Sequence, residues 1–223
     1  MPMFRAFFFI LFAAFPVVSY AVELAVGLQS TFTNIEIQDP EHGDKDVAVM
    51  TSGFHILPTA SLVSSPYYFS ENSNVGVQFQ LDWSFFKSGQ QELQDSQKNV
   101  DLGTSVKGYA ITAVPVLFYH WNRDAGSDWN AKVGIGFGAG YLDLKGNYQI
   151  THVAEHRGET RDVNFDGFGM AINVYLEANK GPHQFQLYNF SPVLSEKEYD
   201  FQGHNVVMAY KYRFDLNEVW PAW

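Results

Sequence analysis

Residues 74–86 read NVGVQFQLDWSFF and alternate apolar with polar side chains almost without a break. Successive side chains of a β-strand point to opposite sides, so this segment has one face of Val, Phe, Leu and Trp and another of Gly, Gln, Asp and Ser. Such a strand separates an apolar medium from a polar one. The pattern recurs along the chain and predicts eight strands, at 22–33, 53–64, 74–86, 106–121, 131–145, 165–178, 183–191 and 204–214.

The connections between these segments alternate in length. Long, acidic-polar connections lie at 34–52, 87–105, 146–164 and 192–203, and shorter ones lie at 65–73, 122–130 and 179–182. An even number of strands, with long loops on one side and short turns on the other, is typical of outer-membrane barrels. We therefore predict an all-β fold: an eight-stranded antiparallel up-and-down transmembrane β-barrel over 22–214, with short periplasmic turns and long extracellular loops.

Alternation alone does not say which face lies inside, because a soluble lipocalin-like barrel also alternates. In a soluble barrel the apolar face, with Phe79, Trp83 and Tyr210, would fill the lumen, and a narrow lumen cannot hold so many rings. Glycines, in contrast, suit a crowded interior, and residues 132–141 read KVGIGFGAGY with every glycine on the polar face. Aromatic residues near the strand ends fit girdles at two membrane interfaces. We therefore predict that the apolar face points outward into lipid.

The N-terminus predicts a secretory signal peptide at 1–21. Arg5 precedes an apolar run over 6–18, and Ser19 and Ala21 place small residues at the positions expected before a cleavage site. The apolar run is shorter than the roughly 20 residues of a helical membrane span.

Composition narrows the classes of function. The chain has no cysteine, which excludes disulfides and thiol chemistry, and its formal net charge is −10 with no basic stripe, which argues against nucleic-acid binding. Its mean hydropathy is only −0.15, although 17% of its residues are aromatic, as expected when only every second residue of a strand meets lipid. His152, Glu155 and His156 do not have the His-Glu-x-x-His spacing of a metalloprotease helix. We assign no cofactor and no metal ligand.

The last predicted strand carries the most specific motif. Residues 206–214 read VVMAYKYRF, which resembles the C-terminal targeting strand of the small eight-stranded outer-membrane proteins of Gram-negative bacteria, the OmpA/OmpX/OmpW-like superfamily. The resemblance is architectural and covers nearly all of the mature chain. It implies a monomer in the cell outer membrane that contacts lipids and lipopolysaccharide and is assembled by periplasmic chaperones and the barrel assembly machinery. This chain continues in a tail, 215–223, so either Phe214 or Trp223 takes the terminal role.

Charged residues on the polar face predict a network in the lumen. With a periplasmic N-terminus, the strand directions place six polar residues together in the periplasmic half: Glu23, His120, Lys132, Glu177, Lys211 and Arg213. Buried charges are costly unless they are paired, so we expect Glu23 to face Lys211 or Arg213 and Lys132 to lie near Glu177. A gated polar pore and a structural filling both fit this pattern. We favour the filling, because eight strands leave no wide channel.

One outer-rim set has the residue types of acyl-transfer chemistry. His55, Asp82 and Ser84 are expected at similar heights on neighbouring strands. The lipid A deacylases among barrels of this size carry a compact His-x-Ser motif on the lipid-facing side, which this chain lacks, so we assign no catalytic residue. We expect a non-enzymatic envelope, surface or small-ligand-binding role. The alternatives are an OmpW-like facilitator of small hydrophobic molecules with a lateral exit, and a lipid A-modifying hydrolase.

Overall fold

The computed structural model describes residues 22–38, 48–51, 55–87, 91–95, 98–102, 105–124, 128–149, 159–196 and 199–216. The predicted signal peptide and most of the predicted tail lie outside these residues. No helix in the described ranges is long and apolar enough to cross a membrane.

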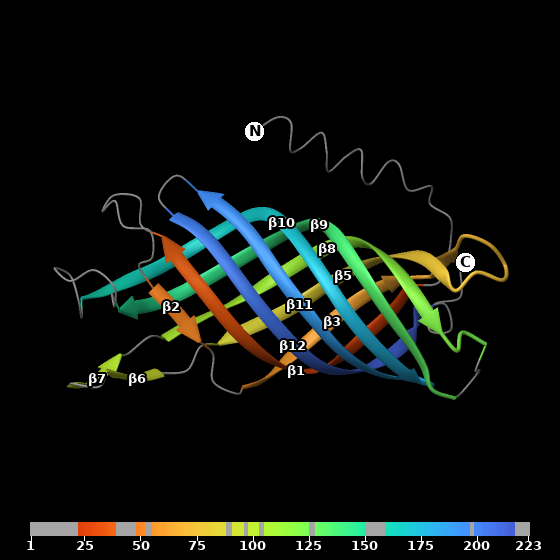
Figure 1. The fold of residues 1–223 in the computed structure, drawn as a ribbon, viewed down its shortest axis with the longest axis horizontal. Helices are drawn as coiled ribbons and strands as arrows, with labels where there is room; N and C mark the ends of the chain where they lie inside the picture. The colour runs from red at the N-terminus through yellow and green to blue at the C-terminus, as the bar shows by residue number, and fades with distance from the viewer. Residues whose placement is uncertain are drawn as a thin grey trace.

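The described residues form β-strands joined by short connections (Figure 1). The strands are β1 (Val22–Gln38), β2 (Ala48–Thr51), β3 (Ile56–Ser64), β4 (Tyr67–Tyr68), β5 (Val75–Lys87), β6 (Gln91–Asp95), β7 (Lys98–Leu102), β8 (Ser105–Trp121), β9 (Asn130–Gln149), β10 (Thr160–Lys180), β11 (His183–Glu196) and β12 (Tyr199–Asp215).

Eight of these strands close into an antiparallel barrel. Each pairs with the next in the order β1, β3, β5, β8, β9, β10, β11 and β12, and β12 pairs back onto β1. The closing ladder runs from Glu23 opposite Asp215 to Gln38 opposite Asp200. The eight predicted strands and the up-and-down order are therefore confirmed.

The two ends of the barrel differ. At one end, called the turn end below, the connections 65–74, 122–129 and 181–182 join neighbouring strands. Gly181 has a φ of 55°, which glycine adopts without strain in the tight turn before β11. At the opposite end, called the loop end, β2 pairs with β1, and β6 and β7 form a separate hairpin (Figure 1).

The strands reach further toward the loop end than the hydrophobic pattern predicts. The prediction ended the fifth strand at residue 145 and began the sixth at residue 165, whereas β9 runs to Gln149 and β10 starts at Thr160. Segments predicted as loop therefore include strand. Hydrogen bonds to a neighbouring strand satisfy the backbone N–H and C=O groups even where a strand has no apolar face. The alternation of apolar and polar residues therefore gives no signal for these extensions.

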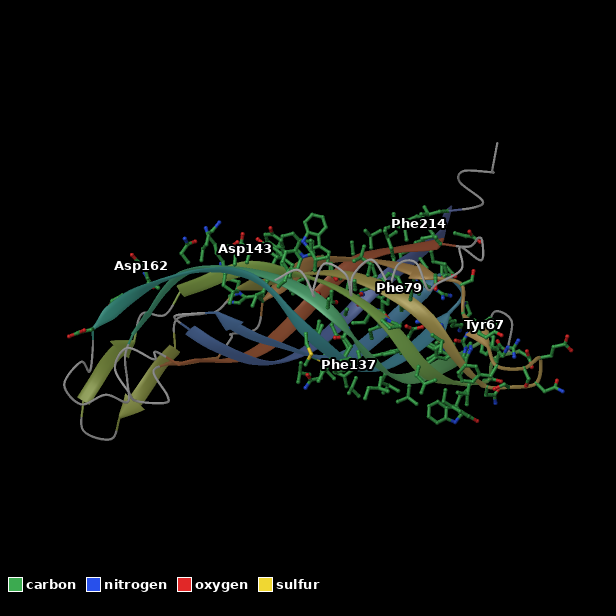
Figure 2. All side chains as sticks on the ribbon, turned by 90° about the horizontal axis from the view of Figure 1, so that it is seen from above. Tyr67, Phe79, Phe137, Asp143, Asp162 and Phe214 are labelled. Atoms are coloured by element: carbon green, nitrogen blue, oxygen red, sulfur yellow. The ribbon has the colours of Figure 1, made fainter. Side chains whose placement is uncertain are left out.

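The apolar face of the barrel points outward, as predicted. Trp83, Phe137 and Phe168 are 47%, 56% and 70% exposed, whereas the inward-facing Lys211 and Glu177 are 0% and 1% exposed. Figure 2 shows Phe137 and Phe214 on the outside of the barrel. At these positions the barrel exposes large apolar side chains and buries charged ones.

The lumen is less uniformly polar than we predicted. On the inward face of β8, apolar residues stand beside the expected Thr112 and His120, and apolar residues of β9 and β10 continue this wall: Ala110, Val114, Val116, Phe118, Leu142, Leu144 and Ala171. The polar side chains gather on the other walls. A chain segment facing a packed interior accepts either kind of side chain, provided that polar groups find partners.

Gly134 shows why the inward face of β9 is rich in glycine. A Cβ added there would lie 2.5 Å from Cε1 of Tyr175, whose ring enters the lumen from β10. Tyr175 is 3% exposed. The missing side chain makes room for a ring from the neighbouring strand.

Candidate functional site: the polar lumen

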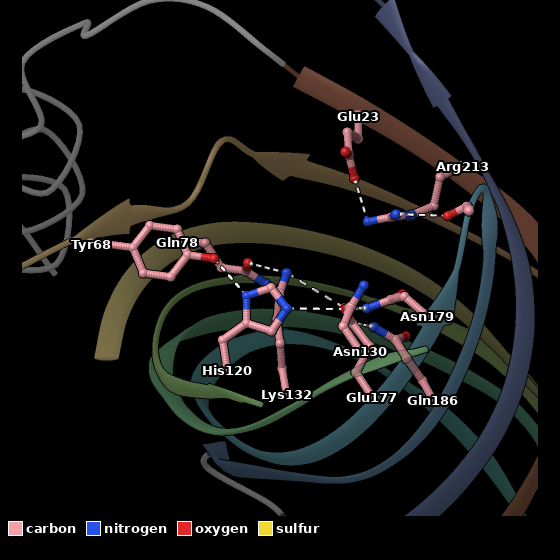
Figure 3. A network of polar contacts seen from close by, with 11 residues as sticks. Glu23, Tyr68, Gln78, His120, Asn130, Lys132, Glu177, Asn179, Gln186 and Arg213 are labelled. Atoms are coloured by element: carbon pink, nitrogen blue, oxygen red, sulfur yellow. Dashed lines mark hydrogen bonds and ion pairs between the residues drawn. The ribbon is translucent and has the colours of Figure 1, made fainter. Parts of the chain in front are cut away.

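A buried ion pair lies in the lumen near the turn end. Lys132 Nζ and Glu177 Oε1 are 3.5 Å apart, and both side chains are nearly inaccessible to solvent. The residues are direct cross-strand partners on β9 and β10, as predicted. Lys132 also donates to Gln78 Oε1 at 3.1 Å, while the amides of Asn179 and Gln186 donate to the Glu177 carboxylate at 2.7 and 3.0 Å (Figure 3). These partners offset the cost of burying the charges.

A second ion pair lies where the barrel closes. Arg213 Nη1 on β12 donates to Glu23 Oε2 on β1 at 3.1 Å, and Arg213 Nη2 donates to the carbonyl oxygen of Gly181 at 3.0 Å. Of the two expected partners of Glu23, Arg213 is therefore the one that contacts it. The pair is partly exposed, so screening by water reduces its contribution to stability.

His120 links the lumen to the connection 65–74 at the turn end. Its Nε2 lies 3.0 Å from Asn130 Oδ1, and its Nδ1 lies 2.6 Å from the Tyr68 hydroxyl (Figure 3). Because Asn130 Oδ1 can only accept, His120 donates from Nε2 and accepts at Nδ1 from Tyr68. Tyr68 belongs to β4, outside the eight barrel strands, and burial raises the pKa of its phenol, which keeps it a donor.

The connection that holds β4 folds against the turn end of the barrel. The Arg123 guanidinium lies 3.7 Å above the Tyr68 ring, and its Nη1 donates to the carbonyl oxygens of Glu71 and Ser73 at 2.8 and 3.0 Å. Gly76 lets β4 approach β5, because an added Cβ there would lie 2.6 Å from the Tyr67 carbonyl oxygen. This connection is thereby fixed to the network beneath the lumen.

Lys211 is placed differently from the prediction. It donates to Ser61 Oγ at 2.5 Å and to Asp82 Oδ1 at 3.4 Å, and not to Glu23. Ser61 Oγ and Gln80 Nε2 donate to the same Asp82 oxygen, at 2.5 and 3.0 Å. β12 and β5 are not neighbours in the sheet, so this contact crosses the lumen. Strand adjacency, the only rule available from sequence, does not reveal it.

The predicted outer-rim set does not come together. Ser61, which is six residues along β3 from His55, is the residue opposite Asp82. Asp82 and Ser84 are instead buried in the lumen, where the Ser84 hydroxyl lies 2.8 Å from the Tyr188 hydroxyl. The expected register between the second and third strands was wrong, because β3 and β5 are joined by a connection containing β4, which shifts their pairing.

Together these contacts fill the barrel. Tyr188 on β11 also donates to Gln29 Oε1 on β1 at 3.4 Å, and Lys211 lies 5.7 Å from the Tyr188 ring centre. Side chains from opposite walls thus meet at several levels. Within the described ranges, no group of three or more His, Cys, Asp or Glu residues is placed to hold a metal ion.

The ladder between β3 and β5 ends before the strands do, and we call the unpaired stretch the seam. This ladder covers only 59–63 and 80–84, so residues 56–58 and 85–87, which the structure describes, lie side by side without pairing. The β10–β11 ladder also ends early, at Met170 and Val193, and leaves 167–169 and 194–196 unpaired with each other. Pro58 lacks the N–H that a ladder needs. Gln29 Nε2 from β1 donates to the Phe85 carbonyl oxygen at 3.0 Å and satisfies a group that the seam leaves unpaired.

No protein-family model matches the chain, and no curated protein matches it. Solved structures similar to it include Ail, the attachment invasion locus protein of Yersinia pestis, with 13% identity over 87% of this chain and 98% of that chain at a TM-score of 0.38. Neisserial surface protein A shares 9% identity over 86% and 97%, with a TM-score of 0.37. The outer membrane protein AlkL shares 13% over 90% and 95%, with a TM-score of 0.32. At these values the matches carry no inference about function, and the closed eight-stranded architecture rests on the strand pairing of this chain.

Proposed function

We propose that the protein is an exported, monomeric outer-membrane protein whose filled barrel anchors the loop end at the cell surface, without enzymatic activity and without an open channel. The observation that carries the proposal is the exposed apolar band between two belts of aromatic residues. Such a band suits the hydrocarbon core of a bilayer, and its aromatic borders suit the interfaces. In this proposal its surroundings are membrane lipids and lipopolysaccharide, and its assembly uses periplasmic chaperones and the barrel assembly machinery.

The belts are groups of ring contacts on the outside of the barrel. The loop-end belt is one connected row, and the turn-end belt combines the Tyr119–Trp121 pair with a separate row from Trp129 to Phe214. The belt at the turn end consists of Tyr119, Trp121, Trp129, His183, Phe185, Tyr210, Tyr212 and Phe214. The belt at the loop end consists of Trp83, Phe85, Tyr109, Tyr141 and Phe168.

The spacing of the belts supports this placement. Tyr109 and Tyr119 lie ten positions apart on β8. At about 3.3 Å per residue and a tilt of about 45°, the belts are separated by about 23 Å along the barrel axis. The apolar band of outer-membrane barrels is about 25 Å tall.

The filled lumen supports anchoring over conduction. Each charged group at its centre has partners from more than one wall, and β9 and β10 continue beyond the loop-end belt with polar outward residues. Asp143, Lys145 and Asp162 are among them, and Figure 2 shows Asp143 and Asp162 nearer than Phe137 to the loop end. This part of the barrel is suited to stand above a membrane surface.

Two measurements test the proposal. Cell fractionation should recover the protein with the outer membrane, in a form whose gel migration changes on heating. In planar bilayers the purified barrel should give no stepwise conductance. Recovery in the soluble fraction would refute the membrane assignment, and reproducible conductance steps would refute the filled lumen.

The seam favours a second candidate, the facilitated passage of small apolar molecules through the wall. It opens at the level of the loop-end belt, beside the apolar wall of the lumen around Ala110 and Leu142. The chain has no cysteine, so Pro58→Cys with Phe85→Cys introduces a single cross-link across the seam. If the seam conducts, oxidation should slow the entry of an apolar dye into proteoliposomes and reduction should restore it. Equal rates in both states would reject this candidate.

A further inference from the structure

Three lysines stand in one row across the outside of the barrel. Lys87 on β5 is directly opposite Lys107 on β8, and Lys107 is directly opposite Lys145 on β9. All three side chains are exposed, and each lies on the outward-facing side of its strand. Directly opposite residues have Cβ atoms about 5 Å apart, so the row is about 10 Å long.

The row lies just beyond the loop-end aromatic belt. Phe85 lies two residues before Lys87 on β5, and Tyr109 lies two residues after Lys107 on β8, each on the same face as the lysine. Their rings are in contact, 6.5 Å between centres. Toward the loop end, the outer surface of the barrel therefore changes from aromatic to cationic over two residues of a strand.

Among the residues that the structure describes, one carboxylate, Asp143, forms an ion pair with the row. Lys145 Nζ lies 3.5 Å from Asp143 Oδ2, but this pair is exposed, and no ion pair joins Lys87 or Lys107 to a side chain that the structure describes. Like charges directly opposite one another destabilise a sheet. Three lysines in register, in a chain of net charge −10, therefore indicate an anionic group from outside.

We propose that the lysine row binds the phosphates of a phosphorylated glycolipid headgroup of the lipid A type, with the acyl chains lying along the loop-end belt. This proposal rests on the proposed function, which puts the loop end at the cell surface. A lipid is favoured over a soluble phosphate because charge and apolar rings adjoin on one face. The length of the row suits a headgroup with two separated phosphates, each attracted by a neighbouring pair of ammonium groups.

The test measures the binding of bisphosphorylated lipid A to the purified full-length protein in detergent, by native mass spectrometry. The triple variant K87Q, K107Q, K145Q removes the row, and K180Q is the matched control, since Lys180 is exposed at the turn end. Each lysine near an anionic lipid surface contributes about 1 kcal/mol, so the triple variant should bind about 150-fold more weakly. The control should bind as the native protein does.

Further arms identify the ligand chemistry. Dephosphorylated lipid A should bind the native protein as weakly as intact lipid A binds the triple variant, and phosphatidylglycerol should bind less well than lipid A. Inorganic phosphate at the same concentration should not compete. Equal binding by native protein and triple variant, or no dependence on the lipid phosphates, would overturn the proposal.

Heat-modifiable migration of every variant separates this outcome from a failure of the proposed function. A protein that is not an outer-membrane barrel would neither insert into bilayers nor show the shift in any variant. A folded, inserted barrel that ignores lipid A would contradict the lysine row alone.

Discussion

Buried charged side chains inside this barrel depend on particular partners. Glu177 is 1% exposed and forms its ion pair with Lys132 through direct cross-strand pairing. Removing one member of a buried pair leaves an uncompensated charge, which costs more than the pair itself contributes.

We expect Glu177→Leu to lower the free energy of unfolding by about 3–5 kcal/mol, because Lys132 would then be buried without its counterion. The double variant Glu177→Leu with Lys132→Met should lose much less. Urea unfolding in lipid vesicles measures both. Equal losses in the single and double variants would show that the carboxylate acts through its bonds to Asn179 and Gln186 instead.

The glycines of β9 give a second prediction at this scale. Gly134→Ala should destabilise the barrel by about 1–3 kcal/mol, since the new Cβ would overlap the Tyr175 ring. Gly140→Ala is the matched control, because its Cβ would meet Thr112 Cγ2 at an ordinary 3.4 Å. Adding Tyr175→Leu should relieve only part of the Gly134→Ala effect, because the added Cβ would also lie 2.8 Å from the Leu117 carbonyl oxygen. The same unfolding assay tests this, and similar effects at both glycines would contradict the steric explanation.

Contacts between adjacent strands could be predicted from the sequence, and contacts across the lumen could not. The alternation of side chains between the two faces of a strand, together with strand direction, predicts Lys132 beside Glu177. It also allows Arg213 beside Glu23. The pairing of Lys211 with Asp82 depends on which side chains reach over the lumen, and this follows from the shear of the barrel rather than from local pattern. His55 was misplaced relative to Asp82 for a different reason, since β4 pairs with the first residues of β5 and shifts the pairing of β5 with β3.

At the scale of the elements, the strands were predictable and their ends were not. Alternation marks a strand only where one face meets an apolar medium, so it locates the middle of β9 and β10 and misses their extensions. The seam between β3 and β5 likewise has a weak sequence signal. Pro58 is its one mark, although Pro115 on β8 also lies within a strand of the closed barrel.

Hydrogen exchange should distinguish the seam from the paired part of the wall. Amides that β3 and β5 direct toward each other at 59–63 and 80–84 should exchange slowly, and those directed into the seam at 56–58 and 85–87 should exchange markedly faster. The β9–β10 ladder, complete over its length, is the internal reference. Uniform protection of β5 up to Lys87 would show that the seam closes in a bilayer.

At the scale of the whole molecule, the two ends of the barrel imply an orientation. The turn end holds the short connections and both terminal segments of the described chain, and the loop end holds β2 and the β6–β7 hairpin (Figure 1). Charged outward residues are found beyond the loop-end belt. We therefore expect the loop end to face the cell exterior.

Epitope insertion tests this orientation. A short tag between Asp95 and Lys98, which joins β6 to β7, should be labelled by antibody on intact cells. The same tag between Asp124 and Asp128, at the turn end, should be labelled only after the outer membrane is opened. Surface tags should be tolerated because connections of this kind accept insertions. Labelling of the second tag on intact cells would reverse the orientation.

The pairing of β12 with β1 also governs the order in which the molecule can be made. The two strands that complete the wall are the earliest and the latest to be synthesised, and each exposes an open hydrogen-bonding edge until the other arrives. A nascent chain lacking its final segment therefore cannot hide either edge, however many of the intervening hairpins have formed. We therefore expect a chain truncated before β12 to aggregate more readily than the full-length protein.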